Sequence, residues 1–305
     1  MTQPFDDLLW KVLHHGERRT DRTGTGTLSL FAPDPLRYDL RDGRVALITS
    51  KKVPWKMALN EFMWMLTGST NVEHLRQWSP AMADIWKAWA NADGELGPTY
   101  GAQYRDAGGS LIDSRATVNF EGAWNIDQRP AGVDQLREVI LRLMDTRDTR
   151  RAVLSLWSVP ELRDMAIEPC MVLFQFSLRG PNYDQLHVHV YQRSADMMLG
   201  VPFDLFQASV LAHLVARELT LLQPARPITA ASLTWSAGDV HIYSNQIEAA
   251  REQLGQAVTA GPAHATIDID TFPSLRLLDS TLEPSHITIR NYNPAPTINA
   301  GKPAV

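Results

Sequence analysis

Two runs of sequence decide the fold: EPCMVLFQFSLRG at 168–180 and LHVHVYQRSADMMLGVPFDLFQASVLAHLVA at 186–216. Both begin with alternating apolar and polar residues, and RGPNYDQ between the strands supplies the residues expected of a turn, so we predict a β-hairpin. After the loop QRSAD, Pro202 and Asp204 are expected to precede a long amphipathic helix. Its apolar stripe consists of Leu205, Ala208, Leu211, Ala212, Val215 and Leu219.

The composition is that of an ordinary globular protein. Of 305 residues, 44% are apolar and 21% charged, which allows a substantial core. No linker, charge run or internal repeat divides the chain, so we predict one domain over residues 1–305. The net charge of −5 argues against coating nucleic acid.

The chain carries the features expected of a soluble, cytoplasmic protein. Its single cysteine excludes an intrachain disulfide and fits a reducing compartment. MTQPFDDLLWKVL lacks the basic segment and apolar core of a signal peptide. No apolar run approaches the length of a membrane span. We therefore expect no membrane contact.

Cys170, directly after Pro169 at the mouth of the hairpin, is a candidate nucleophile, although a lone thiol is also a common small core residue. Glu61 lies in the apolar run KMALNEFMWML at 56–66, where a buried carboxyl is costly unless it has a partner or a function. The alternative is that it reaches solvent at the helix rim. Trp86 and Trp89 share one helical face, for which core packing is the simple explanation.

Other segments are less specific. Helices are predicted at 5–18 and 133–146, and a strand in AVLSLWSV. Residues 231–255 should form a strand, a Gly-Asp turn and a helix. His187 and His189 share one strand face, but no third ligand has suitable spacing, so we predict half-exposed histidines and no metal.

Arginines mark candidate anion contacts. Arg22 lies in DRTGTGTLSLF, a glycine loop that leads into a strand and is not a phosphate-binding Walker A loop. Arg150 and Arg151 end the charged loop DTRDTRR. At a loop–strand junction both could face one phosphate, including one on a neighbouring subunit. A flexible surface loop and a solvated charge cluster are the corresponding alternatives.

Taken in order, the motifs DRTGTGTLSLF, GPTYG, the Arg150–Arg151 pair, Pro169–Cys170, QRSADMMLGVPF and GDVHIYSN resemble those of the thymidylate synthase family over nearly the full length. The resemblance implies an α+β fold with a large mixed sheet packed by helices. It also implies a homodimer formed by packing two such sheets back to back, and 5,10-methylenetetrahydrofolate as cosubstrate.

The resemblance assigns catalytic roles residue by residue. Cys170 matches the nucleophile that adds to C6 of a pyrimidine nucleotide, making C5 an enamine- or enolate-like carbon that attacks a one-carbon unit. Arg193 matches an arginine that favours the thiolate. Glu61 matches the acid that organises water and proton transfer, and Tyr100 the residue that assists removal of the C5 proton.

Binding roles follow in the same way. The family's phosphate-binding residues are matched by Arg22, Arg193 and Ser194 and, from the other subunit, by Arg150 and Arg151. His241 and Tyr243 match the pair that binds the sugar 3′-hydroxyl. The folate pocket matches Trp86, Trp89, Asp196 and the tail that ends at Val305.

Two departures indicate the base. Thymidylate synthases carry asparagine where this chain has Asp204, and the cytosine-specific deoxycytidylate hydroxymethylases carry aspartate. A carboxyl suits the amino group and N3 of cytosine and opposes O4 of uracil. Met171 replaces the histidine that usually follows the nucleophile. The alternative for Asp204 is a helix cap before Leu205, although Asp and Asn cap equally well.

The product rests on whether the one-carbon intermediate takes hydride or water. Trp86, Trp89 and the family-like tail favour a dry pocket and hence methylation of dCMP. Hydroxymethylation of dCMP or CMP stays open as an alternative, although much of the chain differs from the compact phage hydroxymethylases. A further open alternative is an ordinary thymidylate synthase acting on dUMP. A silent nucleotide- or RNA-binding relative is disfavoured by the retained Cys170, Glu61 and arginines.

Overall fold

The computed structural model describes residues 3–21, 24–109, 132–262 and 264–301. Its centre is a mixed sheet with the strand order β1-β2-β7-β6-β5-β4, in which β3 also pairs with β7. Only β6 and β7 run parallel among these described pairs. The strands are β1 (Glu17–Arg19), β2 (Thr27–Phe31), β3 (Leu36–Asp39), β4 (Val153–Ser155), β5 (Met171–Arg179), β6 (Gln185–Asp196) and β7 (Thr229–Tyr243).

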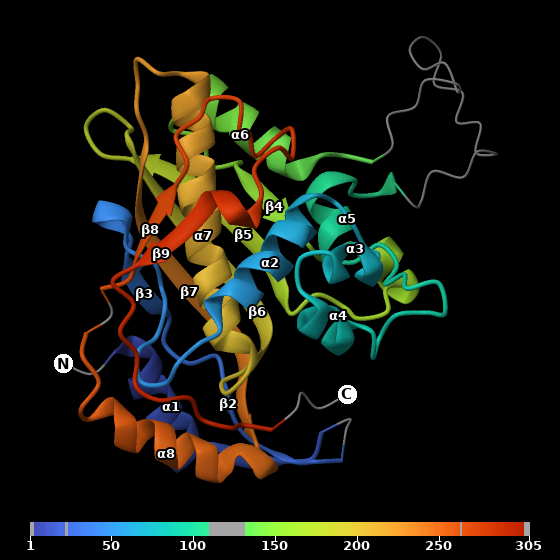
Figure 1. The fold of residues 1–305 in the computed structure, drawn as a ribbon, viewed down its shortest axis with the longest axis vertical. Coiled ribbons are helices and arrows are strands. Elements are labelled where there is room, and N and C mark those ends of the chain that lie inside the picture. Colours follow the sequence, from blue (N-terminus) through green and yellow to red (C-terminus); the bar gives the residue numbers. More distant parts are fainter. Residues whose placement is uncertain (1–2, 22–23, 110–131, 263, 302–305) are drawn as a thin grey trace.

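Helices cover the sheet, and α7 lies across it with α2 beside it (Figure 1). This arrangement confirms the predicted α+β fold with a large mixed sheet. The helices are α1 (Pro4–His15), α2 (Trp55–Leu66), α3 (Val72–Arg76), α4 (Pro80–Trp86), α5 (Tyr100–Arg105), α6 (Gln135–Asp145), α7 (Gly200–Leu222) and α8 (Ile247–Ala257). A separate two-stranded ribbon pairs β8 (Thr266–Ile269) with β9 (Ile287–Arg290).

The central helix is α7. By length and composition it could cross a membrane, but 72% of that apolar stretch is buried inside the protein. It packs on β6 and β7, and every residue of its predicted apolar stripe is buried. The burial of so much apolar surface makes α7 the core helix of the fold.

The predicted hairpin is β5 and β6, with Phe174 opposite Val190 and Phe176 opposite Val188. The predicted helices at 5–18 and 133–146 correspond to α1 and α6. His187 and His189 are partly exposed and contact the hydroxyls of two serines on β7, as expected of strand histidines.

Two predicted breaks are wrong, because β6 and β7 pair along most of their length. QRSAD is the end of β6 and not a loop, and Gly238–Asp239 lies inside β7 and forms no turn. Ser194 pairs with Asp239, and Asp196 with His241, so backbone hydrogen bonds keep both segments extended. These pairings bring the polar ends of the two strands side by side.

The chain after residue 290 returns to the segment that leads into α2. The N–H of Ala295 donates to the carbonyl of Thr49 at 2.8 Å, and the N–H of Lys52 donates to the carbonyl of Pro296. Residues 297–301 continue from there to the cavity described below.

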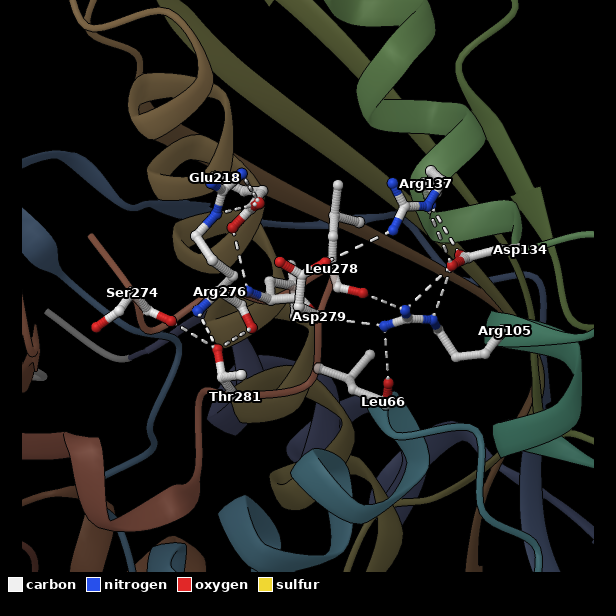
Figure 2. A network of polar contacts seen from close by, with 11 residues as sticks. Leu66, Arg105, Asp134, Arg137, Glu218, Ser274, Arg276, Leu278, Asp279 and Thr281 are labelled. Atoms are coloured by element: carbon white, nitrogen blue, oxygen red, sulfur yellow. Dashed lines mark hydrogen bonds and ion pairs between the residues drawn. The ribbon is translucent and has the colours of Figure 1, made fainter. Parts of the chain in front are cut away.

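A polar network holds the segment before this return in place (Figure 2). Arg105 donates to the carbonyls of Leu66, Leu277 and Leu278, and also pairs with Asp134. On α7, the fully buried carboxylate of Glu218 pairs with Arg276 and accepts from the N–H of Leu277. The network therefore ties α2, α5, α6 and α7 to residues 276–278 (Figure 2).

Candidate active site

A cavity of about 1300 Å³ opens where the ends of β6 and β7 meet the first turns of α7. Residues 297–301 form part of its wall. The cavity brings together residues that lie far apart in the sequence and that the sequence singled out: Glu61, Trp89, Tyr100, Cys170, Arg193, Ser194, Asp196, Asp204, His241 and Tyr243.

Cys170 sits directly before β5, and its thiol is partly buried. Its backbone N–H donates to Tyr100 Oη at 2.7 Å, and its carbonyl accepts from the N–H of Arg193 at 2.8 Å. Burial raises the pKa of the thiol, while the charge of Arg193 and the contact with Tyr100 oppose that rise. The effect of Arg193 on the thiol has the predicted sign, although burial outweighs it.

The guanidinium of Arg193 also fixes the chain that leads into Cys170. Its Nε donates to the carbonyl of Pro169 at 3.0 Å, and a terminal nitrogen to that of Glu168 at 2.8 Å. The guanidinium carbon lies 5.3 Å from the ring centroid of Trp157. These contacts hold a cation and a thiol together at one end of the cavity.

Glu61 is 9% exposed on α2, and both of its carboxylate oxygens have donors. Trp86 Nε1 donates to Oε1 and Gln207 Nε2 to Oε2, each at 2.6 Å. Burial raises the pKa of Glu61, and the two hydrogen bonds oppose that rise. A buried carboxyl was expected to need a partner, and Glu61 has two, Trp86 and Gln207.

Asp204 Oδ2 accepts from Gln192 Nε2 at 2.7 Å. The orientation of that amide is fixed, because Gln192 Oε1 accepts from the indole N–H of Trp235 at 2.8 Å and an indole can only donate. Burial raises the pKa of Asp204 to about 7; the bond from Gln192 opposes the rise, and the charges of Glu61 and Asp196 add to it. The carboxyl is therefore poised to exchange a proton near neutral pH.

Asp204 does not cap a helix, so that alternative is wrong. The helix α7 begins at Gly200 and Asp204 lies inside its first turns. The turn before the helix is held instead by Asp196, whose Oδ1 accepts from the N–H groups of Met198 and Leu199 at 2.8 and 3.2 Å. Asp204 is free of a capping role and lines the cavity.

The ring of His241 is oriented by a carboxylate. Its Nδ1 donates to Asp239 Oδ1 at 2.8 Å, and Asp239 Oδ2 accepts from Ser29 Oγ at 2.7 Å. Burial acts to raise the pKa of Asp239, but these two hydrogen bonds hold it below its ordinary value. The ring of Tyr243 lies edge-on to His241 with centroids 5.1 Å apart. Since Nδ1 is committed to Asp239, Nε2 is the nitrogen left for a ligand.

Lys51 adds a cation to the wall. It is buried, and its Nζ donates to the carbonyl of Met198. Burial lowers the pKa of Lys51 to about 8, and the nearby charge of Asp196 opposes that shift. Burial in turn raises the pKa of Asp196, against the hydrogen bonds from the turn before α7.

The family model for thymidylate synthase matches residues 3–304. A thymidylate synthase of Corynebacterium aurimucosum is 36% identical over 299 residues, covering 97% of this chain and 96% of the relative. The chain belongs to the thymidylate synthase family. This family catalyses folate-dependent C5 methyl transfer to a pyrimidine nucleotide.

The cavity fits the two ligands of a thymidylate synthase family member. Its lining includes polar and charged groups from β6 and β7. It also includes apolar side chains that suit a flat folate ring, namely Met57, Met82, Ile85, Trp89, Leu199, Phe203 and Ile298. Among the described lining residues Trp89 is present but Trp86 is not. Trp86 is buried, 5.8 Å from Trp89 between ring centroids, and its indole N–H donates to Glu61. The contact of Trp86 with folate stays a prediction.

Several predicted residues lie elsewhere. Arg150 and Arg151 are exposed and do not line the cavity of their own chain. Arg22 and Val305 lie outside the described residues. Where the chain is described, no group of three or more His, Cys, Asp or Glu side chains could hold a metal ion.

Four site residues were not predicted: Lys51, Gln192, Gln207 and Asp239. Gln207 follows Asp204 by three residues, a spacing that places both on one helix face. This spacing indicates that Gln207 is a site residue once the start of the helix is known. Gln192 and Asp239 lay in segments interpreted as a loop and a turn. Their strand geometry, which aims them at Asp204 and His241, had no visible signal in the sequence.

Proposed function

We propose that this member of the thymidylate synthase family methylates dCMP to 5-methyl-dCMP with methylenetetrahydrofolate as cosubstrate. The observation that carries the proposal is Asp204, a half-buried carboxyl that lines the cavity, has no capping role and is held by Gln192. An asparagine at this position would serve the uracil edge, whereas a carboxyl serves the cytosine edge.

Chemistry at N3 supports the assignment to cytosine. When the Cys170 thiolate adds to C6, the electron pair of the C5–C6 double bond moves through C4 to N3, and N3 takes a proton. Burial raises the pKa of Asp204 to about 7, so a substantial fraction of this carboxyl carries a proton at neutral pH. Asp204 is then the donor to N3, and the resulting carboxylate accepts from the C4 amino group.

The same step on uracil places negative charge on O4. The ionised fraction of Asp204 opposes that charge, whereas an asparagine N–H at this position would stabilise it at every pH. Met171, 2% exposed directly after the nucleophile, brings no group that could compensate by a strong hydrogen bond. Both departures therefore disfavour dUMP as the substrate.

The remaining residues take the roles that their contacts support. Arg193 binds phosphate, stabilises the Cys170 thiolate and orients the chain before it. Tyr100 Oη accepts from the N–H of Cys170, so its own proton is left for exchange near C5. Glu61 handles protons around the base. Ser194 contributes to the phosphate contacts, and Arg22 with the partner's arginine pair completes them.

His241 binds the sugar 3′-hydroxyl through Nε2, because Asp239 occupies Nδ1. Tyr243 shares this contact. On the other side of the cavity, Trp89, Asp196 and the C-terminal residues enclose the folate, which supplies the one-carbon unit and the hydride. The apolar wall excludes water from the reacting carbon, which supports methylation over hydroxymethylation.

We also propose that two copies pack through their sheets, so that Arg150 and Arg151 reach the phosphate of the neighbouring site, and that the enzyme works in the cytoplasm. The exposure of both arginines away from their own cavity supports the shared site. A guanidinium fork suits a phosphate because it offers paired donors in one plane.

The test is turnover with methylenetetrahydrofolate and dCMP, dUMP or CMP in separate reactions. We expect dCMP to be consumed fastest, with a product mass of the methyl derivative and absorbance from dihydrofolate. Preference for dUMP would overturn the assignment of the base. A hydroxymethyl product without dihydrofolate would overturn the methyl assignment and leave the cytosine assignment standing.

A further inference from the structure

Two buried carboxyls share the cavity, and their contacts differ. Glu61 has a donor on each oxygen, Trp86 on one and Gln207 on the other. Asp204 has a single side-chain donor among the described residues, Gln192. Hydrogen bonds to a carboxylate favour its ionised form, so the contacts favour a charged Glu61 and a protonated Asp204.

Gln207 is built to act on this pair. It lies three residues after Asp204 on α7 and is 2% exposed. Its Nε2 donates to Glu61 Oε2 at 2.6 Å and to the carbonyl of Ala58 at 3.0 Å. Because both partners are acceptors, the nitrogen must face α2, and the amide cannot turn to present its oxygen to Glu61.

We propose that Gln207 is a positioning residue that keeps Glu61 ionised and thereby leaves the shared proton on Asp204. The inference rests on the proposed function, in which Asp204 must deliver a proton to N3 of cytosine. Gln207 touches neither the reacting atoms nor Asp204 through any described hydrogen bond, so it acts through Glu61.

The coupling is electrostatic. The negative charge of Glu61 raises the pKa of Asp204, and like charges in a water-poor cavity ionise one at a time. Without the amide N–H, Glu61 takes up a proton more readily. The titration midpoint of Glu61 then rises towards that of Asp204, and the two carboxyls share the proton more evenly.

Other charged and titratable groups around Asp204 do not replace this effect. They are Asp196 on β6, Tyr100 and Tyr104 on α5, and Cys170 with Arg193 at the nucleophile. Burial of the two tyrosines raises their pKa values, so they stay neutral when Asp204 titrates. The charge of Asp196 raises the pKa of Asp204 in the same direction as Glu61, and Gln207 has no described bond to Asp196.

The experiment is carboxyl-carbon NMR titration of the whole protein labelled at Asp or Glu side-chain carboxyls. Signals of the two groups are assigned by their absence in Asp204→Asn and Glu61→Gln. In the wild type we expect Glu61 to titrate at lower pH than Asp204. In Gln207→Met, which keeps the side-chain length and removes the donor, the midpoint of Glu61 should rise by about one pH unit and the gap between the two midpoints should narrow.

Ser209→Ala is the matched control on the same helix. Ser209 is buried and hydrogen-bonded to the backbone of Phe206 and Ala46, away from both carboxyls, so its loss should leave both midpoints in place. With dCMP, Gln207→Met should move the acid limb of the pH profile of kcat/KM to higher pH and so narrow the profile, because Glu61 must be charged and Asp204 protonated. A uniformly lower rate with unmoved limbs would show a merely structural role and overturn the inference.

Two further outcomes separate this inference from the proposed function. If the midpoints move as expected but dUMP is the preferred substrate, the assignment of the base fails and the role of Gln207 in the carboxyl pair stands. If dCMP is preferred but Asp204 titrates below Glu61 in the wild type, the role of Gln207 fails alone. The order in which Glu61 and Asp204 titrate in the wild type needs no Gln207 variant. It therefore tests the role of Gln207 even if Gln207→Met does not fold.

Discussion

Replacing Asp204 by asparagine should stabilise the folded protein at neutral and alkaline pH, although the change removes a residue of the site. Asparagine has nearly the same volume and keeps an oxygen for the N–H of Gln192, which donates to Asp204 at 2.7 Å. The substitution therefore removes a buried titratable group and little else. Its effect on stability follows from the proton affinity of that group.

Burial raises the pKa of Asp204 from its ordinary value of 3.8 to about 7. Below about pH 4 the carboxyl is protonated in both the folded and the unfolded chain. Between about pH 4 and pH 7 the unfolded chain releases the proton while the folded protein keeps it, so wild-type stability falls as the pH rises. Each tenfold difference in proton affinity is worth about 1.4 kcal/mol, which gives an upper bound of about 4 kcal/mol above pH 7.

Urea unfolding of both proteins at a series of pH values measures this directly. The free energy of unfolding of the variant should increase relative to that of the wild type from about pH 4 to pH 7, and the difference should then level off. Asp34→Asn serves as the control, because the side chain of Asp34 is 92% exposed and pays no burial penalty. A stability difference that is independent of pH, or that shrinks as the pH rises, would refute the placement of Asp204 as a buried, proton-holding carboxyl.

Three further outcomes are expected. Asp204→Asn should shift the ratio of kcat/KM for dUMP over dCMP by a hundredfold or more, since each mismatched buried hydrogen bond costs about 1–3 kcal/mol; an unchanged ratio measured in competition would mean that this carboxyl does not read the base. Cys170→Ser should abolish turnover while nucleotide binding, followed by calorimetry, persists; retained turnover would sink the nucleophile. Arg276→Leu should lower the free energy of unfolding by about 3–5 kcal/mol, because Glu218 has no exposed surface and would keep a buried charge without its counter-ion; a loss under 1 kcal/mol in urea unfolding would contradict the role of the network in Figure 2.

The predicted hairpin and core helix illustrate what local pattern can and cannot define. Alternation and helical spacing identified β5, β6 and α7, because these patterns reflect which side chains face the core. The start of α7 was placed too late, and the ends of β6 and the middle of β7 were interpreted as irregular. Parallel pairing between two strands of distant sequence holds those segments extended, and no short window of sequence contains that information.

The sequence by itself determined the family-like motifs, the candidate nucleophile Cys170 and the departure at Asp204, since these depend only on residue type and order. Only the tertiary structure decided that Asp204 is no helix cap, that Trp86 donates to Glu61, and that Gln192 and Gln207 each donate to one of two acids at the cavity. The physical reason is that a proton's position depends on burial, on donors and on neighbouring charges. Those quantities arise only when β6, α2 and α7 are brought together around one cavity.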